Sequence, residues 1–194
     1  MSIQTPSAQQ AHATLRLQLH ASYTMDDACR DLPYFARLGV THLYLSPISR
    51  SREGSMHGYD VVDHTQVDEA RGGEPALRRL ASAARQHGLG LLLDIVPNHM
   101  ATDPGNAWWW DVLTHGKNSR FANWFDIDWE AQGTGGKILA PFLGKPTEQA
   151  LQEGDIRLRH DELRGLHLEV HGQAWPLAPE SIAGLGVEKL EHDS

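Results

Sequence analysis

The stretch "LLLDIVPNHM", residues 91–100, decides the fold expected for this chain of 194 residues. Its first six residues are mostly apolar, as in a parallel strand that is covered on both faces of its sheet. Pro97 cannot donate to a strand ladder and keeps the preceding residue extended, so strand pairing should stop there. Asn98 and His99 then follow at the carboxyl end of the strand, where parallel α/β sheets carry their functional groups.

Asp94 interrupts the apolar run inside the predicted strand. A carboxylate at that position is partly buried and needs a hydrogen-bond donor as a partner. Two interpretations follow from the strand pattern alone, and it favours neither. Asp94, Asn98 and His99 either belong to a ligand site, or they form a structural Asp–His–Asn knot that closes the loop.

The residues before this stretch alternate between strand and helix patterns. Thr24 and Asp27 have the spacing of a helix capping box, and Gly39 is a typical helix stop. The pattern predicts a parallel α/β sheet in βαβαβ order, followed by a further helix over 106–116. The expected order is a strand over 14–20, a helix within 22–39, a strand over 40–47, a long polar loop over 48–73, a helix over 74–88 and a strand over 89–96.

Charge and composition exclude several classes of function. The net charge is −8 and no run of Lys or Arg occurs, so we expect neither a nucleic-acid partner nor an anionic membrane surface. Cys29 is the single cysteine, which rules out an intrachain disulfide and favours a reducing, cytoplasmic location. We find no signal peptide, no apolar run of membrane-spanning length, no nucleotide or serine-hydrolase motif and no His spacing typical of metal ligands. No cofactor and no metal are therefore expected.

The polar loop contains "GSMHGYD", residues 54–60. Tyr59 offers a flat apolar ring with one polar tip, the type of side chain that stacks on the face of a sugar. His57 and Asp60 flank it. The alternative is an ordinary loop packed by one aromatic residue. For "WWW" at 108–110 we expect core packing, because successive helical residues point about 100° apart and cannot share one face.

The composition changes near residue 118. "FANWFDIDWE" is aromatic and acidic, a glycine-rich turn follows it, and residues 156–170 alternate apolar and charged side chains. That alternation predicts antiparallel strands with one solvated face. We therefore expect a frayed N-terminus over 1–12, an α/β part over 13–117 and a second part over 118–194.

Several of these stretches carry a family resemblance. "LLLDIVPNHM" resembles the first conserved region of the α-amylase superfamily (glycoside hydrolase family 13), and "HGYDVVDH" looks like its Gly-Tyr loop. "TLRLQLHASYTMDDA", "WWWDVLTHGKNSRFANWFDIDW" and "KILAPFLGKP" resemble, in order, the maltooligosyl trehalose synthase branch of that superfamily. The similarity covers roughly residues 13–180. It implies the N-terminal part of a (β/α)8 TIM barrel, about three βα units, with an incomplete small α+β subdomain inserted after the third strand.

The resemblance also implies a substrate and a set of site residues. The branch converts the reducing-end α-1,4 linkage of maltooligosaccharides to an α,α-1,1 trehalose linkage by retaining intramolecular transglucosylation. By match, His99 hydrogen-bonds the sugar beside the reacting bond and Tyr59 stacks beneath it. The residues that brace these two are His57, Asp60, Asp94 and Asn98.

The chain also departs from the family pattern. In the superfamily the nucleophile lies on the fourth barrel strand, the acid on the fifth and a third carboxylate after the seventh, and we find no counterpart of them here. We therefore expect no catalytic residue in this chain, no activity from it alone, and the missing C-terminal part of the enzyme as a partner. Leu15 stands where the family has an aromatic residue, and "GQAWPLAP" lacks an expected His.

Two alternatives remain beside the synthase. One is another glycosidase of the α-amylase superfamily, and the other is a non-catalytic carbohydrate-binding fragment. Whichever holds, three strands cannot close an eight-stranded barrel. An open sheet of this size exposes unpaired edges and apolar side chains. We expect the exposed set to be Leu43, Leu45, Leu91 and Leu93.

Overall fold

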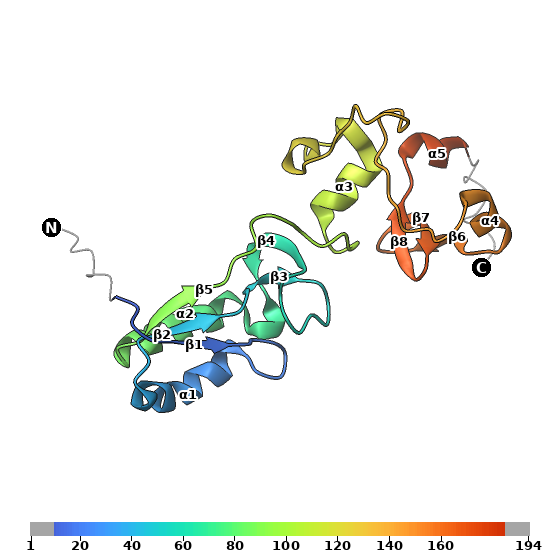
Figure 1. Ribbon diagram of the computed structural model, residues 1–194. Helices are drawn as coiled ribbons and strands as arrows, with labels where there is room; N and C mark the ends of the chain where they lie inside the picture. The colour runs from blue at the N-terminus through green and yellow to red at the C-terminus, as the bar shows by residue number, and fades with distance from the viewer. Residues whose placement is uncertain (1–9, 185–194) are drawn as a thin grey trace. The chain divides into compact units, whose positions relative to one another are not determined.

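The computed structural model describes residues 10–184 and divides the chain into two compact units. The first is Met1–Ala101 and the second is Thr102–Ser194 (Figure 1). Most of the expected frayed start lies outside the described residues, as does the end of the chain after residue 184. Each unit is described by itself.

The first unit confirms the predicted parallel βαβαβ order. Its sheet has the strand order β1-β2-β5, and both neighbouring pairs run parallel. Leu43 on β2 lies opposite Leu15 on one side and Leu91 on the other. The elements are β1 (Thr14–Leu17), α1 (Met25–Leu38), β2 (His42–Leu45), β3 (Ser49–Ser51), β4 (Val61–Val67), the 3-10 helix η1 (Glu69–Arg71), α2 (Gly73–Gln86) and β5 (Gly90–Leu93).

The ends of α1 follow the predicted signals. The Thr24 side chain accepts from the Asp27 backbone, and the Asp27 carboxylate accepts from the Thr24 backbone N–H at 2.7 Å, which completes a capping box. Gly39 ends the helix with a φ of 85°, a left-handed conformation that suits glycine. Local sequence therefore sets both helix limits.

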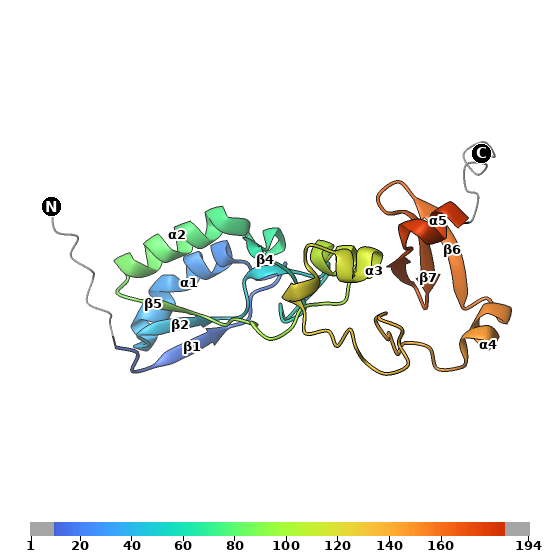
Figure 2. The ribbon, with the colours of Figure 1, turned by 90° about the horizontal axis from the view of Figure 1, so that it is seen from above.

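Both helices cover the same face of the sheet (Figure 2). The expectation that Leu43 and Leu45 are exposed is wrong, because α1 and α2 bury both side chains completely. Leu91 is partly buried, whereas Leu93 is 45% exposed as expected. The core consists of strand leucines and of helix residues that recur at helical spacing: Leu17, Leu19, Met25, Ala28, Leu32, Phe35, Leu43, Leu45, Ala76, Leu80, Ala84 and Leu89.

The other face of the sheet carries the alternate side chains, among them Arg16, Tyr44 and Leu92, which lie in register. Leu92 is 39% exposed, so the prediction that β5 is covered on both faces does not hold in this unit. β5 is also shorter than predicted, since its last pairing is with Leu45, where β2 ends.

The predicted long polar loop over 48–73 is partly ordered. β3 and β4 pair as an antiparallel ribbon, and η1 follows. Val61 and Val62 at the start of β4 are buried, and their β-branched side chains favour extended backbone. The loop prediction was wrong because glycines and charges around this short apolar pair dominated the pattern.

The second unit contains short elements joined by long irregular segments. β6, β7 and β8 form an antiparallel sheet in that order, which confirms the strands predicted over 156–170. The elements are α3 (Ala107–His115), the 3-10 helices η2 (Gly116–Asn118) and η3 (Ala122–Trp124), α4 (Thr147–Gln152), β6 (Ile156–Asp161), β7 (Gly165–Val170), β8 (Gln173–Pro176) and α5 (Pro179–Gly184).

The division between units falls ahead of the composition change near 118, because α3 contacts η2 and β8 within the second unit. The start of an inserted subdomain at 118 stays a prediction.

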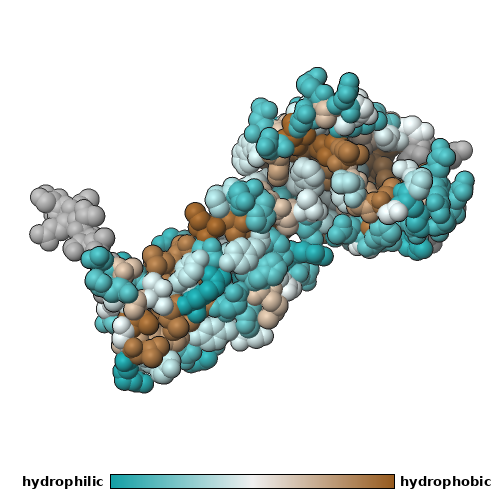
Figure 3. Space-filling view, in the orientation of Figure 1, coloured by the Kyte–Doolittle hydropathy of each residue, from teal (hydrophilic) through white to brown (hydrophobic). Residues whose placement is uncertain are grey.

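Trp108 and Trp109 of α3 pack against other aromatic residues, and all three tryptophans at 108–110 are partly buried. Trp108 lies 4.9 Å from Trp124 and 6.2 Å from Phe121, measured between ring centroids, and Trp109 lies 5.3 Å from Phe125. Apolar surface is nevertheless visible on both units in Figure 3. Among residues 10–184, no helix has the length and apolarity that a membrane crossing requires.

Candidate functional site

The candidate site lies beyond the carboxyl ends of the parallel strands. Asp94 directly follows β5, and Tyr59 comes from the loop between β3 and β4. The Tyr59 hydroxyl donates to Asp94 Oδ2 at 2.6 Å, and Arg16 Nη1 on β1 donates to the same oxygen at 2.9 Å. Arg16 Nη2 also donates to the Tyr59 hydroxyl oxygen at 3.0 Å. Three segments far apart in the sequence therefore meet at one carboxylate.

Asp94 thus has the donors that a partly buried carboxylate needs. Its side chain is 14% exposed. The Tyr59 hydrogen bond and, after it, the Arg16 hydrogen bond hold the pKa of Asp94 below its usual range by favouring the charged form. The same carboxylate raises the pKa of the Tyr59 hydroxyl, because the proton is shared with an anion. Asp94 remains a carboxylate and Tyr59 a phenol at neutral pH.

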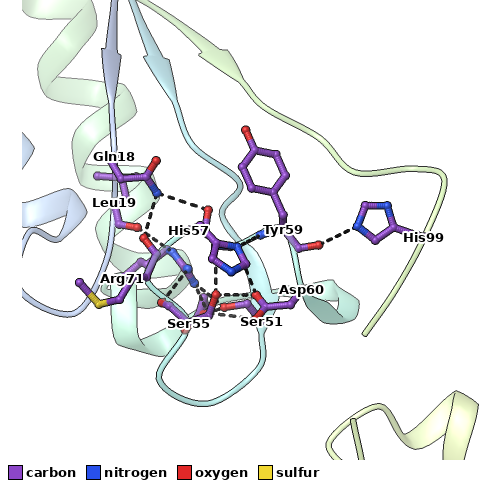
Figure 4. Close-up of polar contacts among 12 residues, drawn as sticks. Gln18, Leu19, Ser51, Ser55, His57, Tyr59, Asp60, Arg71 and His99 are labelled. Carbon is purple, nitrogen blue, oxygen red and sulfur yellow. Dashed lines mark hydrogen bonds and ion pairs between the residues drawn. The ribbon is translucent and has the colours of Figure 1, made fainter. Parts of the chain in front are cut away.

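The main chain of Tyr59 is held by two histidines. His99 Nε2 lies 3.1 Å from the Tyr59 carbonyl oxygen, and the Tyr59 N–H donates to His57 Nδ1 at 3.0 Å. The rings of His57 and Tyr59 are stacked at 6.0 Å. Asn98 Oδ1 lies 3.2 Å from His99 Nδ1. The structure therefore brings the predicted contact residues Tyr59 and His99 together (Figure 4).

Asp60 closes the turn that carries Tyr59. Its carboxylate accepts from the Ser55 hydroxyl and lies 3.8 Å from His57 Nδ1. The Ser55 oxygen in turn accepts from the Gly58 N–H at 3.1 Å. Gly58 has a φ of 82°, and a Cβ there would lie 2.7 Å from the Pro47 carbonyl oxygen. This turn requires glycine before Tyr59 for both backbone and space.

A buried guanidinium lies beneath the turn (Figure 4). Arg71 is 1% exposed and forms an ion pair with Asp68. It also donates to the Leu19 carbonyl at 3.1 Å, the Ser51 hydroxyl at 2.8 Å and the Ser55 carbonyl at 3.4 Å. Arg71 thereby joins the segment after β1, the β3–β4 ribbon and the start of the Tyr59 turn.

Sequence reasoning missed Arg16, Gln18 and Arg71. Gln18 Nε2 donates to the Met56 carbonyl at 3.0 Å and to the His57 carbonyl at 3.3 Å. A signal for Arg16 and Gln18 existed, because "TLRLQLH" alternates leucine with polar residues. Those polar residues lie on the sheet face opposite the helices. Arg71 had no such local signal.

The site presents exposed groups suited to a sugar. Tyr59 is 38% exposed and His99 is exposed, so a ligand can contact an aromatic ring and part of an imidazole ring. Asp94 and Asp60 are both committed to donors within the site. Among the described residues 10–184, no three His, Cys, Asp or Glu side chains are grouped as metal ligands.

The family model of the α-amylase catalytic domain matches residues 24–152, which is more than half of the chain. The chain belongs to the α-amylase family. The resemblance predicted from "LLLDIVPNHM" is thereby confirmed. This places the Tyr59, Asp94 and His99 arrangement within a family of carbohydrate-active catalytic domains.

Individual relatives agree with the family. A Mycobacterium tuberculosis protein named as a maltooligosyl trehalose synthase is 43% identical over 181 residues, which is 90% of this chain and 22% of that protein. The structure of maltooligosyltrehalose synthase from Arthrobacter ramosus matches 86% of this chain and 21% of its own at 45% identity, with a TM-score of 0.75. Neopullulanase 2 of Thermoactinomyces vulgaris is 43% identical over 97 residues, half of this chain and 16% of its own. The chain spans about a fifth of the length of these synthases.

Proposed function

We propose that this chain forms one wall of a maltooligosaccharide site in an enzyme of the maltooligosyl trehalose synthase type. The observation that carries the proposal is the contact between Tyr59 and His99 beside the Asp94 carboxylate. Tyr59 stacks on a glucose ring beside the exposed imidazole of His99, while the bracing residues keep both in place. Identity of 43–45% to such synthases over most of the chain supports this substrate class.

The proposed reaction is retaining intramolecular transglucosylation, which turns the reducing-end α-1,4 linkage into an α,α-1,1 linkage. It needs a nucleophilic carboxylate and a carboxylic acid about 5 to 5.5 Å apart. Asp60 and Asp94 are poor candidates for these roles, since Asp94 is paired with Arg16 and Asp60 accepts from Ser55. We therefore propose that residues 1–194 alone do not form trehalose and that the reacting carboxylates come from the rest of the enzyme.

The proposal extends to the fold. We infer that β1, β2 and β5 are the first three strands of an eight-stranded barrel and that residues 118–194 belong to a subdomain inserted after the third. The parallel order of these strands and the TM-score of 0.75 to the Arthrobacter ramosus synthase support this assignment.

A chimera tests the proposed reaction. Residues 13–180 replace the matching segment of the Arthrobacter ramosus synthase. The products formed from maltopentaose are then distinguished by their mass and by whether they retain a reducing end. We expect a non-reducing product of unchanged mass, and a kcat/KM roughly tenfold lower after Tyr59→Ala or His99→Ala. Tyr34→Ala, an exposed tyrosine on α1, is the matched control. A chimera that folds but only shortens the substrate contradicts the synthase assignment.

The 43% identity between half of this chain and a neopullulanase supports a second candidate, a hydrolase of the same family. Hydrolysis shortens maltopentaose and creates new reducing ends, so the same product analysis separates the two. A third candidate is a binding fragment without catalysis. It predicts that the chain alone binds maltopentaose in calorimetry and that Tyr59→Ala abolishes the binding.

A further inference from the structure

We propose that Arg16 is the positioning residue for Tyr59. It holds the tyrosine hydroxyl and the Asp94 carboxylate in one closed triangle, so that the ring meets a sugar in a fixed orientation. The inference rests on the proposed function, in which Tyr59 stacks on the sugar, and it assigns a role to Arg16 on β1, for which the family resemblance implied none.

Each corner of the triangle contacts the other two. Arg16 Nη1 donates to Asp94 Oδ2 at 2.9 Å, and Arg16 Nη2 donates to the Tyr59 hydroxyl oxygen at 3.0 Å. Tyr59 donates its own proton to Asp94 Oδ2 at 2.6 Å. The hydroxyl therefore uses its donor and accepts one hydrogen bond. The two bonds fix the tip of the ring from different directions.

Arg16 is itself held in place by the sheet. Its guanidinium carbon lies 4.8 Å from the centroid of the Tyr44 ring, its register partner on β2. A cation over an aromatic face is attracted to it, and the planar guanidinium can stack there. The forked guanidinium can also donate to two different acceptors at once, which the single ammonium of a lysine does less well.

The main chain of Tyr59 is held independently, through His57 and His99. Both ends of the residue are thus fixed, while the ring between them is 38% exposed. A side chain that is ordered before binding loses little freedom when the ligand arrives. Removing the Arg16 contact frees the tip and leaves the backbone in place, so the expected effect is on ring order and sugar affinity.

A purely electrostatic role for Arg16 makes a different prediction. If Arg16 only neutralises Asp94, any cation at this position is sufficient, and Arg16→Lys behaves as wild type. If Arg16 positions Tyr59, lysine keeps most of the charge effect on Asp94 but loses much of the ring order. Arg79→Met is the matched control, because Arg79 also donates twice to one carboxylate, that of Asp26, at 2.9 and 2.7 Å between the helices.

The experiment measures three quantities on the full 194-residue chain and its Arg16→Met, Arg16→Lys and Arg79→Met variants. NMR relaxation gives the order parameter of the Tyr59 ring, a carboxyl NMR titration gives the pKa of Asp94, and calorimetry gives the affinity for maltopentaose. We expect Arg16→Met to lower the ring order, raise the pKa of Asp94 and weaken sugar binding roughly three- to tenfold. Compared with Arg16→Met, Arg16→Lys should recover more of the Asp94 pKa than of the Tyr59 ring order. Arg79→Met should change none of the three quantities.

Failure of the positioning role and failure of the proposed sugar site give different results. Unchanged Tyr59 ring order in Arg16→Met overturns the positioning role, whatever the sugar affinity. Full recovery of ring order in Arg16→Lys also overturns it, in favour of simple charge neutralisation. Wild type that shows no maltopentaose binding, while its ring order depends on Arg16, supports the positioning of Tyr59 and counts against sugar as the ligand of this chain.

Discussion

The two units of the chain stabilise themselves in different ways. Residues 10–101 bury one continuous core between a parallel sheet and two helices of 14 residues each. In residues 102–184 the α-helices have six to nine residues, and the buried apolar side chains come one each from α3, η3, α4 and β7. Aromatic pairs carry much of the packing there, such as the stack of Phe142 on Trp175 at 4.2 Å.

This difference shows why the candidate site lies on the first unit. A site needs groups held within a fraction of an ångström, and side chains supported by a packed core and a sheet meet that condition more easily than loops do. Arg16, Tyr59 and Asp94 are all anchored to the strands or to the buried Arg71 network. The second unit offers an exposed aromatic residue in Trp124, whose ring contacts are with Trp108 and Phe121.

Aromatic residues make the comparison measurable. All four tyrosines lie in the first unit and all six tryptophans in the second. Tyrosine absorbance in urea therefore reports on the unfolding of the first unit, and tryptophan fluorescence on that of the second. Variants in one unit should move only one of the two transitions. Coincident shifts in both signals would show that the units unfold together.

The largest effect is expected from Arg71→Met. The change leaves Asp68 as a buried carboxylate without its cation, and breaking such a pair costs about 3–5 kcal/mol. The tyrosine-reported transition should move to lower urea, and the tryptophan-reported one should not. Arg78→Met removes an exposed pair with Glu74 and should change stability by less than about 1 kcal/mol. Similar effects of both variants would mean that the buried network is dispensable.

Leu43→Ala tests the core directly. Leu43 is fully buried between the sheet and the helices, and truncation of such a leucine costs about 2–5 kcal/mol. The matched change Leu158→Ala removes a leucine of β6 that is 44% exposed, and should cost no more than about 0.5 kcal/mol. Chemical unfolding of both variants with the two probes checks the contrast. Equal costs would contradict the division into a strongly and a weakly packed unit.

Phe142→Leu tests the aromatic packing of the second unit. Leucine keeps apolar volume but loses the ring stack on Trp175, which contributes about 0.5–1.5 kcal/mol beyond area burial. We expect the tryptophan-reported transition to shift by that amount. Leu163→Ala, at a residue that is 86% exposed, serves as the control and should leave the transition in place. No shift in Phe142→Leu would mean that the stack adds nothing to stability.

The smallest effect is expected from the ionisation of Asp94. Tyr59 and Arg16 lower its folded pKa below the ordinary value of 3.8. Its contribution to stability is therefore complete above that value and is lost as the pH falls through the lower, folded pKa. The stability difference between wild type and Asp94→Asn should shrink as the pH drops from about 5 to about 2. Glu53→Gln, at an exposed glutamate, is the control. A difference that grows in acid would contradict the sign.

Local patterns were enough to predict much of the fold. Period-two and helical repeats identified the parallel strands and the two α-helices of the first unit, and the Thr24–Asp27 box and Gly39 marked the limits of α1. The β3–β4 ribbon was missed because its buried part is only the pair Val61 and Val62. The length of β5 was overestimated because a strand ends where its neighbour ends, and β2 ends at Leu45.

The sequence by itself determined the βαβαβ order, the antiparallel strands near the end, the family, and the choice of Tyr59, Asp94 and His99 as candidate site residues. The strands and helices follow from short-range spacing, and the family follows from the resemblance of short motifs that each lie within one element or loop. Only the tertiary structure decided which helices bury Leu43 and Leu45, and which donors reach Asp94. Arg16 meets Asp94 from 78 residues away because parallel strand register places them on one sheet face, and no local pattern encodes that distance.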